Sequence, residues 1–451
     1  MLYRKAYAKL EEWKHESHRK ALCIVGARQI GKTTIIREFG HREYKYFVEI
    51  NFATDQQAAG IFADSFEADR LITNLTAYVR QPMEPHNTLI FFDEVQECPR
   101  VRTAIKFLVE DGRFDYVESG SLLGQRQKEI LSYPVGFEEI YQMFPMDFEE
   151  FLLANSVQDS TIQYLQECFE KLVPVSDSVH NTMCRLFYSY IVVGGMPEAV
   201  RIYTETHDIG QVVSYQREIL ELYRLDIAKY AFGNDRIKIK AIFDSIPAQL
   251  NEKNRRFVLR DIDPNGRQNR YENSFLWLAD AGVALPCYNV TEPRAPLQLN
   301  EKHSLFKLFL CDTGLLCAAC MENIQLDLLQ GNMKINMGSI LENMMAQQLK
   351  ANGFSLNYFD TKKIGELDFL VSKGMKVLQI EVKSGNNYKK HPALNRIKAV
   401  EVWKNNPSYV FCKGNIETEN GITYLPWYEV MFLRQEEIPL NIIYEVDISK
   451  L

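Results

Sequence analysis

The stretch that decides the fold is Gly26-Ala-Arg-Gln-Ile-Gly31-Lys32-Thr33. The apolar run Ala21–Val25 precedes it and predicts a buried strand, and Thr34–Phe39 follows it and predicts the first turns of a helix. The spacing matches G-x-x-x-x-G-K-[ST], a loop between strand and helix whose backbone N–H groups bind phosphate. The predicted phosphate-binding residues are Gly26, Ala27, Arg28, Gln29, Ile30, Gly31, Lys32, Thr33 and Thr34.

Within this loop, the residue types have separate chemical tasks. Gly26 and Gly31 allow the backbone conformations that turn N–H groups inward. Lys32 is expected to reach the β- and γ-phosphates of ATP, and Thr33 to ligate Mg²⁺. The alternative is a chance Gly-Lys-Thr at a helix start, and the strand and helix on either side argue against it.

A second apolar run, Thr88-Leu-Ile-Phe-Phe, ends in Asp93 and Glu94. Ligands of parallel α/β sheets bind outside the carboxyl ends of the strands, so both acids are expected beside the phosphate loop. We predict that Asp93 holds the Mg²⁺ shell and that Glu94 orients or deprotonates the attacking water. Two solvated acids at a strand end are the alternative. Ser119, in the Ser-Gly-Ser that follows the next predicted strand, is expected to sense the γ-phosphate, although such a turn needs no ligand.

Composition narrows the class of protein. A chain of 451 residues predicts two to four domains, and its net charge of −7 excludes a strongly cationic binder of nucleic acid. No apolar stretch is long enough to cross a bilayer, and the N-terminus lacks a secretory signal, so we expect no membrane partner. The nine scattered cysteines favour a cytoplasmic location. Cys317 and Cys320 form a lone C-x-x-C pair, which we interpret as small core residues rather than zinc ligands.

A second group of charged residues lies near the C-terminus. Gly365–Val371 and Lys376–Lys383 predict a hairpin with a turn at Lys373-Gly374. The hairpin carries Asp368, Glu381 and Lys383, and residues 381 and 383 share a face because side chains alternate along a strand. Upstream, residues 338–350 predict an amphipathic helix with one acid, Glu342, among apolar residues.

Carboxylates and a lysine that converge at a sheet edge can bind Mg²⁺ and activate water against a phosphodiester. The arrangement resembles the PD-(D/E)xK nuclease superfamily, with Asp368, Glu381 and Lys383 on the hairpin and Glu342 as the helix acid. Leu367 stands where the family name has proline. The resemblance implies that Glu342, Asp368 and Glu381 are metal ligands and that Asp368, Glu381 and Lys383 are catalytic. An ordinary amphipathic hairpin with exposed charges is the alternative.

The pattern along the chain predicts an α/β protein in four parts. These are a P-loop ATPase domain with a parallel sheet at 1–150, a helical lid or linker at 151–232, a winged-helix-like module at 233–330 and a restriction-endonuclease-like α/β domain at 331–451. In the third part, helices at 237–251 and 273–281 precede strands at 283–290 and 307–311. Five arginines make that part basic, which fits a DNA-binding face or a solvated one: Arg255, Arg256, Arg260, Arg267 and Arg270.

The order of these features resembles a prokaryotic family of AAA-type ATPases whose C-terminal domain of unknown function combines a winged helix with a nuclease-like fold. The resemblance spans the chain and rests on the motifs at residues 26–34, 92–96, 119–121, 144–151, 194–198, 226–227, 312–316, 338–343, 366–369 and 380–384. The family usually has Gly-Arg after Pro-Val, whereas here Phe137 follows Gly136, so the role of an arginine finger from a neighbouring subunit is in doubt.

Two functional hypotheses follow. The first is an ATPase with ATP and Mg²⁺ as cofactors, coupled to a C-terminal domain that binds nucleic acid, DNA in preference to RNA, and for which cleavage is open. The second is a regulatory ATPase whose nuclease-like domain is inactive and serves for binding. A metabolic kinase is a weak third reading, because no acceptor site is recognisable. A homo-oligomer is compatible with each hypothesis.

Overall fold

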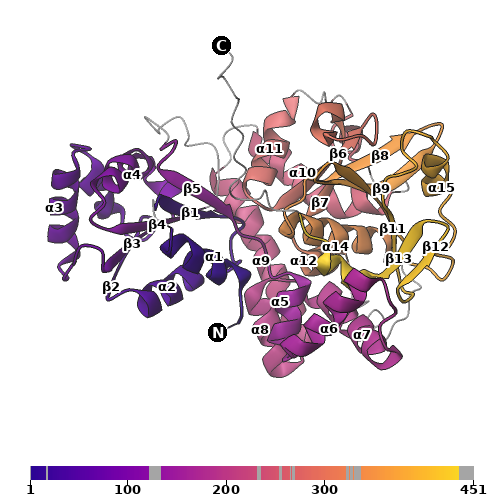
Figure 1. Ribbon diagram of the computed structural model, residues 1–451. Coiled ribbons are helices and arrows are strands. Elements are labelled where there is room, and N and C mark those ends of the chain that lie inside the picture. The colour runs from indigo at the N-terminus through magenta and orange to yellow at the C-terminus, as the bar shows by residue number, and fades with distance from the viewer. Residues whose placement is uncertain are drawn as a thin grey trace, which may run out of the picture.

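The computed structural model describes residues 2–16, 19–120, 134–230, 235–252, 256–264, 266, 270–320, 325, 329 and 337–435. Two α/β bodies lie on either side of the long helix α9 (Ile209–Tyr230), and shorter helices of the middle region lie beneath it in the view of Figure 1.

Five parallel strands form the N-terminal sheet in the order β2-β3-β4-β1-β5. Their bounds are β1 (Ala21–Val25), β2 (Tyr46–Asn51), β3 (Thr88–Asp93), β4 (Asp115–Gly120) and β5 (Glu138–Gln142). The helices of this body are α1 (Lys5–Lys14), α2 (Lys32–Glu43), α3 (Ala68–Val79) and α4 (Pro99–Asp111), with the 3-10 helices η1 (Gln56–Phe62) and η2 (Val95–Glu97). The predicted α/β fold with a parallel sheet is therefore confirmed.

The two faces of this sheet pack against different helices, because side chains alternate along each strand. Leu89 and Phe91 of β3 belong to one hydrophobic core with Ile36 of α2. Ile90 and Phe92, from the same strand, belong to a second core under α3 and α4. The continuous apolar run 88–92 is thus the mark of a central strand that is covered on both faces.

Helices dominate the middle region, as its pattern predicts. They are α5 (Phe148–Ala154), α6 (Asp159–Lys171), α7 (Asp177–Val193), α8 (Pro197–Thr206) and α9. Gly194, with a φ of +70°, ends α7, and Pro197 occupies the first turn of α8, where its missing N–H leaves no hydrogen bond unmade.

The C-terminal body is built on an eight-stranded mixed sheet in the order β12-β13-β11-β10-β9-β8-β6-β7. Its strands are β6 (Ala284–Val290), β7 (Glu301–Leu310), β8 (Asn357–Thr361), β9 (Gly365–Lys373), β10 (Lys376–Val382), β11 (Ser408–Cys412), β12 (Glu417–Glu419) and β13 (Ile422–Pro426). Its helices are α10 (Asp235–Asn251), α11 (Glu272–Asp280), α12 (Thr313–Cys320), α14 (Met337–Ala351) and α15 (Pro392–Lys398), with the 3-10 helices η4 (Leu259–Asp261), η6 (Leu297–Asn300) and η7 (Trp427–Phe432).

The structure adds one connection to this body that the sequence does not indicate and corrects the position of one turn. The hairpin β6–β7 exists, but β6 also pairs in parallel with β8, so the strands of the winged-helix-like module continue the sheet of the nuclease-like part. The boundary near residue 330 therefore does not separate two sheets. The tight turn between β9 and β10 lies at Gly374-Met375, one residue later than predicted, because Lys373 still pairs with Lys376.

Candidate functional sites

The phosphate loop lies between β1 and α2, as the sequence predicts. Gly26 has a φ of +150° and Gly31 a φ of +90°, both in the region that favours glycine. A Cβ atom at residue 26 would also lie 2.3 Å from the carbonyl oxygen of Met143. Gly26 is therefore required both for its conformation and for the close approach of the segment that follows β5.

Lys32, the first residue of α2, points back into this loop. Its Nζ donates to the carbonyl oxygens of Gly26 at 3.0 Å and Ala27 at 2.8 Å. Burial lowers the pKa of Lys32 to about 8, against the opposing influence of Glu94 and Asp93. The buried ammonium group is thus held by two backbone carbonyl oxygens, and a bound phosphate would compensate its lost hydration.

Polar groups from helix α2 and from strands β2 and β4 converge on Asp93. Thr33 Oγ1 lies 3.2 Å from one of its carboxylate oxygens, Asn51 Nδ2 donates to it at 2.8 Å, and the Ser119 hydroxyl donates to it as well. Burial raises the pKa of Asp93, and the hydrogen bonds from Ser119, Thr33 and Asn51 oppose that rise. Thr33 and Asp93, the predicted Mg²⁺ ligands, therefore meet. The Ser119 hydroxyl, predicted to sense the γ-phosphate, contacts Asp93 here.

Glu94 has a left-handed backbone, with a φ of +55°. Its carboxylate accepts a hydrogen bond from Gln96 and lies 3.9 Å from the guanidinium of Arg28. Such a conformation costs about 1–3 kcal/mol in a residue other than glycine and is concentrated at functional sites. With this backbone conformation, the chain leaves the direction of β3 at Glu94, and the Glu94 carboxylate lies beside Arg28 of the phosphate loop.

The C-terminal part of the chain also reaches the loop. Arg28 Nη1 donates to Asp226 of α9 at 2.6 Å, and the Tyr223 hydroxyl donates to the Arg28 carbonyl at 3.0 Å. A Cβ atom at Gly282, after α11, would lie 2.8 Å from the backbone nitrogen of Ala27. Asp226 belongs to a motif of the family resemblance, but the sequence does not indicate these contacts.

In the C-terminal sheet, Asp368 and Glu381 lie across from each other on β9 and β10. Ile380 pairs with Phe369, so these two residues are the next opposed pair, and Asp368 Oδ2 accepts a hydrogen bond from Val382 N at 2.7 Å. Both line a pocket of about 430 Å³ together with Lys383. The predicted convergence on one side of the hairpin is therefore present.

Glu381 is the most perturbed group of this pocket. Burial raises the pKa of Glu381 to about 8; the charge of Asp368 adds to the rise and Lys383 opposes it. Lys383 Nζ donates to Glu381 Oε1 at 2.5 Å, whereas Oε2 is buried without a hydrogen-bond partner. A buried carboxylate oxygen without a partner beside a second carboxylate fits a site for a divalent cation.

Glu342, the expected helix acid, lies on α14 but is bound to another residue. Lys307 of β7, which is 0 % exposed, contacts Glu342 at 3.2 Å and Glu366 at 2.6 Å. Gly338, at the start of α14, lines the pocket instead. Lys307 is recognisable in the sequence as well, because a lysine within the apolar run Phe306–Leu310 indicates a buried charge with a partner.

The basic stretch between residues 255 and 270 is partly neutralised by an ion pair. Arg256 pairs with Asp360, and Arg260 and Arg270 are exposed. Arg255 and Arg267 lie outside the described residues.

A buried polar cluster that the sequence analysis missed lies within the N-terminal sheet. Among the described residues, Cys23, Glu118 and Glu138 bring possible metal-ligand atoms within 4.8 Å of one another. Arg102 of α4 forms an ion pair with Glu138, and both oxygens of Glu118 lack a hydrogen-bond partner. Burial raises the pKa of Glu118 well above its usual value, and the charge of Glu138 adds to the rise. The raised pKa favours the protonated form of Glu118 beside the ion pair of Arg102 and Glu138.

Comparison with known proteins agrees with this geometry. Residues 18–152 match the family model of the AAA domain. The N-terminal α/β body therefore matches the AAA domain in sequence, over about the first third of the chain. Behind the AAA domain, residues 184–327 and 337–430 match two domains of unknown function, DUF8612 and DUF4143. A search of curated proteins found no match.

Solved structures resemble parts of the chain at low identity. Domain III of the replication initiation protein DnaA of Thermotoga maritima is 15% identical, with 49% of this chain and 94% of that chain covered and a TM-score of 0.26. A RuvB variant of the same organism is 15% identical, with coverages of 62% and 87% and a TM-score of 0.28. Cdc6p of Pyrobaculum aerophilum is 10% identical, with coverages of 72% and 92% and a TM-score of 0.23. Likeness at this level says nothing about function.

Among the described residues, no helix is both long enough and apolar enough to cross a membrane.

Proposed function

We propose that the AAA domain binds ATP with Mg²⁺ and hydrolyses it. The observation that carries the proposal is the contact of Thr33 with Asp93 at the carboxyl edge of the sheet, next to Lys32, whose ammonium group points into the loop. Lys32 would bind the β- and γ-phosphates, and Thr33 and Asp93 would hold the ion. When bound, Mg²⁺ neutralises charge that develops on the phosphate oxygens.

Glu94 is the residue that we assign to the attacking water. Its left-handed backbone sets it beside the loop, and its neighbours Gln96 and Arg28 restrict the carboxylate. A carboxylate held in this way can orient a water molecule for in-line attack on the γ-phosphate.

Two variants separate binding from hydrolysis. Lys32→Ala removes the main phosphate cation and should abolish nucleotide binding. Glu94→Gln should bind ATP as the wild type does and slow turnover by roughly 100-fold or more, because only the water-orienting group changes. Glu97→Gln, three residues further along at the end of η2, is the matched control. Turnover of Glu94→Gln at the wild-type rate would exclude its assigned role.

For the C-terminal pocket, we propose that Asp368 and Glu381 bind one divalent cation and that Lys383 assists cleavage of a phosphodiester. The buried oxygen of Glu381 without a partner supports the cation, and the ion pair with Lys383 places a positive charge beside it. Glu342 stays a proposed ligand of this cation only if it leaves Lys307. When bound, the cation would supply an activated water.

Cation binding at this pocket should depend on pH in a defined direction. Because the pKa of Glu381 is about 8, binding below that pH must displace a proton. The affinity for Mn²⁺, measured by calorimetry, should therefore rise with pH by at most about tenfold per unit up to pH ~8. An Asp368→Asn variant should lose this binding, whereas unchanged affinity between pH 6 and pH 8 would contradict the proposed ligand.

Nucleic acid, with DNA favoured over RNA, is the proposed partner of the C-terminal body. Lys390 lines the pocket, whereas Lys389 is occupied by Glu417 and Glu419. Binding in a gel-shift assay should weaken steeply with salt, because neutralised phosphates release counterions. Asp368→Ala and Lys383→Ala should each abolish cleavage and leave ATP hydrolysis intact.

If DNA and RNA both fail to bind at low salt with ATP present, the regulatory hypothesis is favoured. Its nuclease-like domain would then be inactive and serve for contacts. The nine cysteines carry free thiols, which supports the proposed cytoplasmic location. A homo-oligomer stays a prediction that the measured mass in solution would test.

A further inference from the structure

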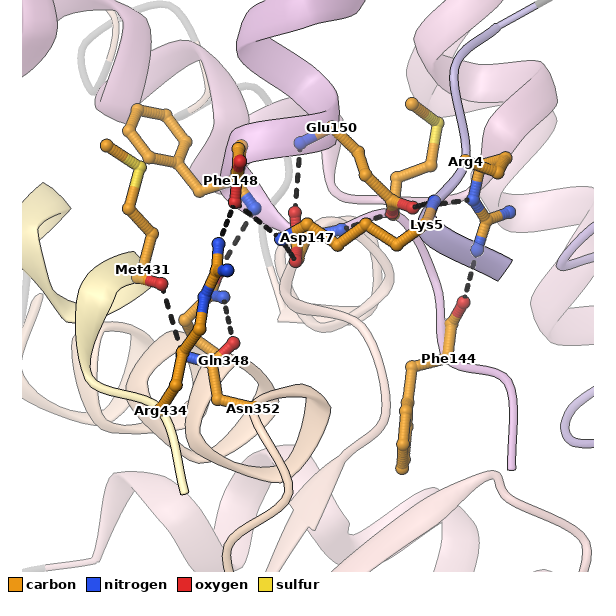
Figure 2. A network of polar contacts seen from close by, with 12 residues as sticks. Arg4, Lys5, Phe144, Asp147, Phe148, Glu150, Gln348, Asn352, Met431 and Arg434 are labelled. Atoms are coloured by element: carbon orange, nitrogen blue, oxygen red, sulfur yellow. Dashed lines mark hydrogen bonds and ion pairs between the residues drawn. The ribbon is translucent and has the colours of Figure 1, made fainter. Parts of the chain in front are cut away.

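Arg4, just before α1, is buried against the outside of the phosphate loop. Its Nη1 donates to the carbonyl oxygen of Ile30 at 2.7 Å, and its Nη2 donates to the carbonyl oxygen of Phe144 at 2.7 Å. Its Nε donates to Glu150 at 3.2 Å, and Figure 2 shows the guanidinium between Phe144 and Glu150. Arg4 is 7 % exposed, so nearly all of it is enclosed by protein.

The contact with Ile30 acts on the part of the loop that binds phosphate. In a trans peptide the carbonyl oxygen and the following N–H point in opposite directions. A carbonyl of Ile30 that is bound to Arg4 therefore turns the N–H of Gly31 to the other side, where the predicted phosphate lies. Gly31 has a φ of +90°, and a glycine can adopt many other backbone conformations as well. A contact from outside the loop is therefore needed to hold the peptide in this one orientation.

Arg4 is itself held in place by the segment that leaves the AAA domain. Asp147 and Glu150 form a capping box at the start of α5, and Glu150 Oε1 also accepts a hydrogen bond from the backbone nitrogen of Lys5 at 2.7 Å. The backbone nitrogen of Phe148 donates to Gln348 of α14 at 3.1 Å (Figure 2). A series of hydrogen bonds thus connects the phosphate loop, through Arg4 and the start of α5, with helix α14, which carries Glu342.

We propose that Arg4 is a positioning residue of the nucleotide site, which orients the Ile30–Gly31 peptide for phosphate binding from outside the loop. The proposal rests on the proposed ATP binding. Arg4 touches no phosphate, since its guanidinium lies behind the loop against Glu150 and two carbonyl groups. Its three acceptors match the fork of an arginine and not the single ammonium of a lysine.

A double variant isolates the contact with the loop. Arg4→Met alone would leave Glu150 buried without its cation, which is strongly destabilising. Arg4→Met with Glu150→Gln removes both charges, and Glu150→Gln alone keeps Arg4 and a capping box with glutamine. Lys5→Met is the matched control, because Lys5 pairs with Asp147 and Glu149 and has no contact with the loop among the described residues.

The readouts are the Kd of a fluorescent ATP analogue and the kcat and KM of ATP hydrolysis, each measured well below the melting temperature. We expect the Kd and KM of the double variant to rise roughly tenfold over Glu150→Gln, with kcat nearly unchanged, because the Gly31 N–H contacts phosphate before and during the reaction. Lys5→Met should bind as the wild type does, and Glu150→Gln is the reference against which the double variant is compared.

Equal affinities of the double variant and Glu150→Gln would overturn the proposal. If the double variant does not fold, Arg4→Lys takes its place, since it keeps the charge beside Glu150 and lacks the fork. Its Kd should then rise, and a wild-type Kd would overturn the proposal. Failure of the proposed ATP binding is distinguishable, because then neither the wild type nor Lys32→Ala binds the analogue.

Discussion

Lys32 illustrates how burial prepares a residue for its ligand. Its side chain is almost fully enclosed, and the two carbonyl groups it contacts replace only part of its hydration. The pKa of about 8 follows from that loss. A triphosphate would restore the charged form, so nucleotide binding and proton uptake are coupled at this residue.

The affinity for ATP should therefore fall as the pH rises above about 8. In that range the free protein loses the proton of Lys32, and binding must take it up again, so the Kd should increase by at most about tenfold per pH unit. Titration of a fluorescent ATP analogue between pH 7 and pH 10 measures this. Lys32→Arg keeps its charge throughout the range and should show a flat profile. A flat profile in the wild type would show that Lys32 stays charged.

At the scale of the element, β4 presents neighbouring residues to opposite environments. Ser119 faces the nucleotide site and contacts Asp93, whereas Glu118 faces the buried cluster with Arg102 and Glu138. The side-chain period of two places them on opposite faces. One strand thus contributes to the site and to an unusual polar interior.

Glu118 should make the stability of the AAA domain depend on pH. Its folded pKa is raised above the unfolded value of about 4.5, so the unfolded chain loses the proton first and stability falls as pH rises through that window. Glu118→Gln cannot ionise. The stability of this variant relative to the wild type should increase by at most about 1.4 kcal/mol per pH unit above pH ~4.5.

Urea unfolding at pH 5 and pH 8 measures this slope, with Glu110→Gln on the exposed face of α4 as the control. A constant difference between Glu118→Gln and the wild type at the two pH values would contradict the raised pKa of Glu118.

At the scale of the whole molecule, one joint unites the AAA domain with the C-terminal body. The backbone nitrogen of Met146 donates to the Gly195 carbonyl at 2.6 Å, and Gly195 N donates to Asp312 at 2.6 Å. Asp312 is fully buried, and its desolvation raises its pKa to about 6. A single hydrophobic core runs from Ile24 of β1 to Phe369 of β9. The two bodies therefore do not behave as independent domains on a flexible linker.

Gly195→Ala should weaken this joint. A Cβ atom there would lie 2.0 Å from the carbonyl oxygen of Met146, so the backbone must shift, at a cost of about 1–3 kcal/mol or more. Thermal unfolding followed by circular dichroism should show a lower midpoint. Gly60→Ala is the matched control, because a Cβ at residue 60 meets open space. Equal unfolding midpoints for the two variants would mean that the backbone around Gly195 can shift without a loss of stability.

Much of the fold can be predicted from the sequence, because its signals are local. The strands at 21–25, 46–51 and 88–93, the helix start at Lys32 and the hairpin with Asp368 and Glu381 each have a hydrophobic period or a turn of their own. The position of Asp93 beside Thr33 also follows, since the carboxyl ends of parallel strands meet at one edge. Asn51, opposite Asp93 on β2, could have been predicted by the same rule.

The chain by itself therefore determined the phosphate loop, its acidic strand and the pair of carboxylates on the C-terminal hairpin. Only the tertiary structure decided that Arg4 braces the loop, that Lys307 takes Glu342, and that β6 joins one sheet with β8. These contacts join residues far apart in sequence, and no local period encodes which distant groups share a buried charge. The physical reason is burial. A charge that is removed from water needs a partner, and the tertiary structure decides which distant residue lies close enough to be that partner.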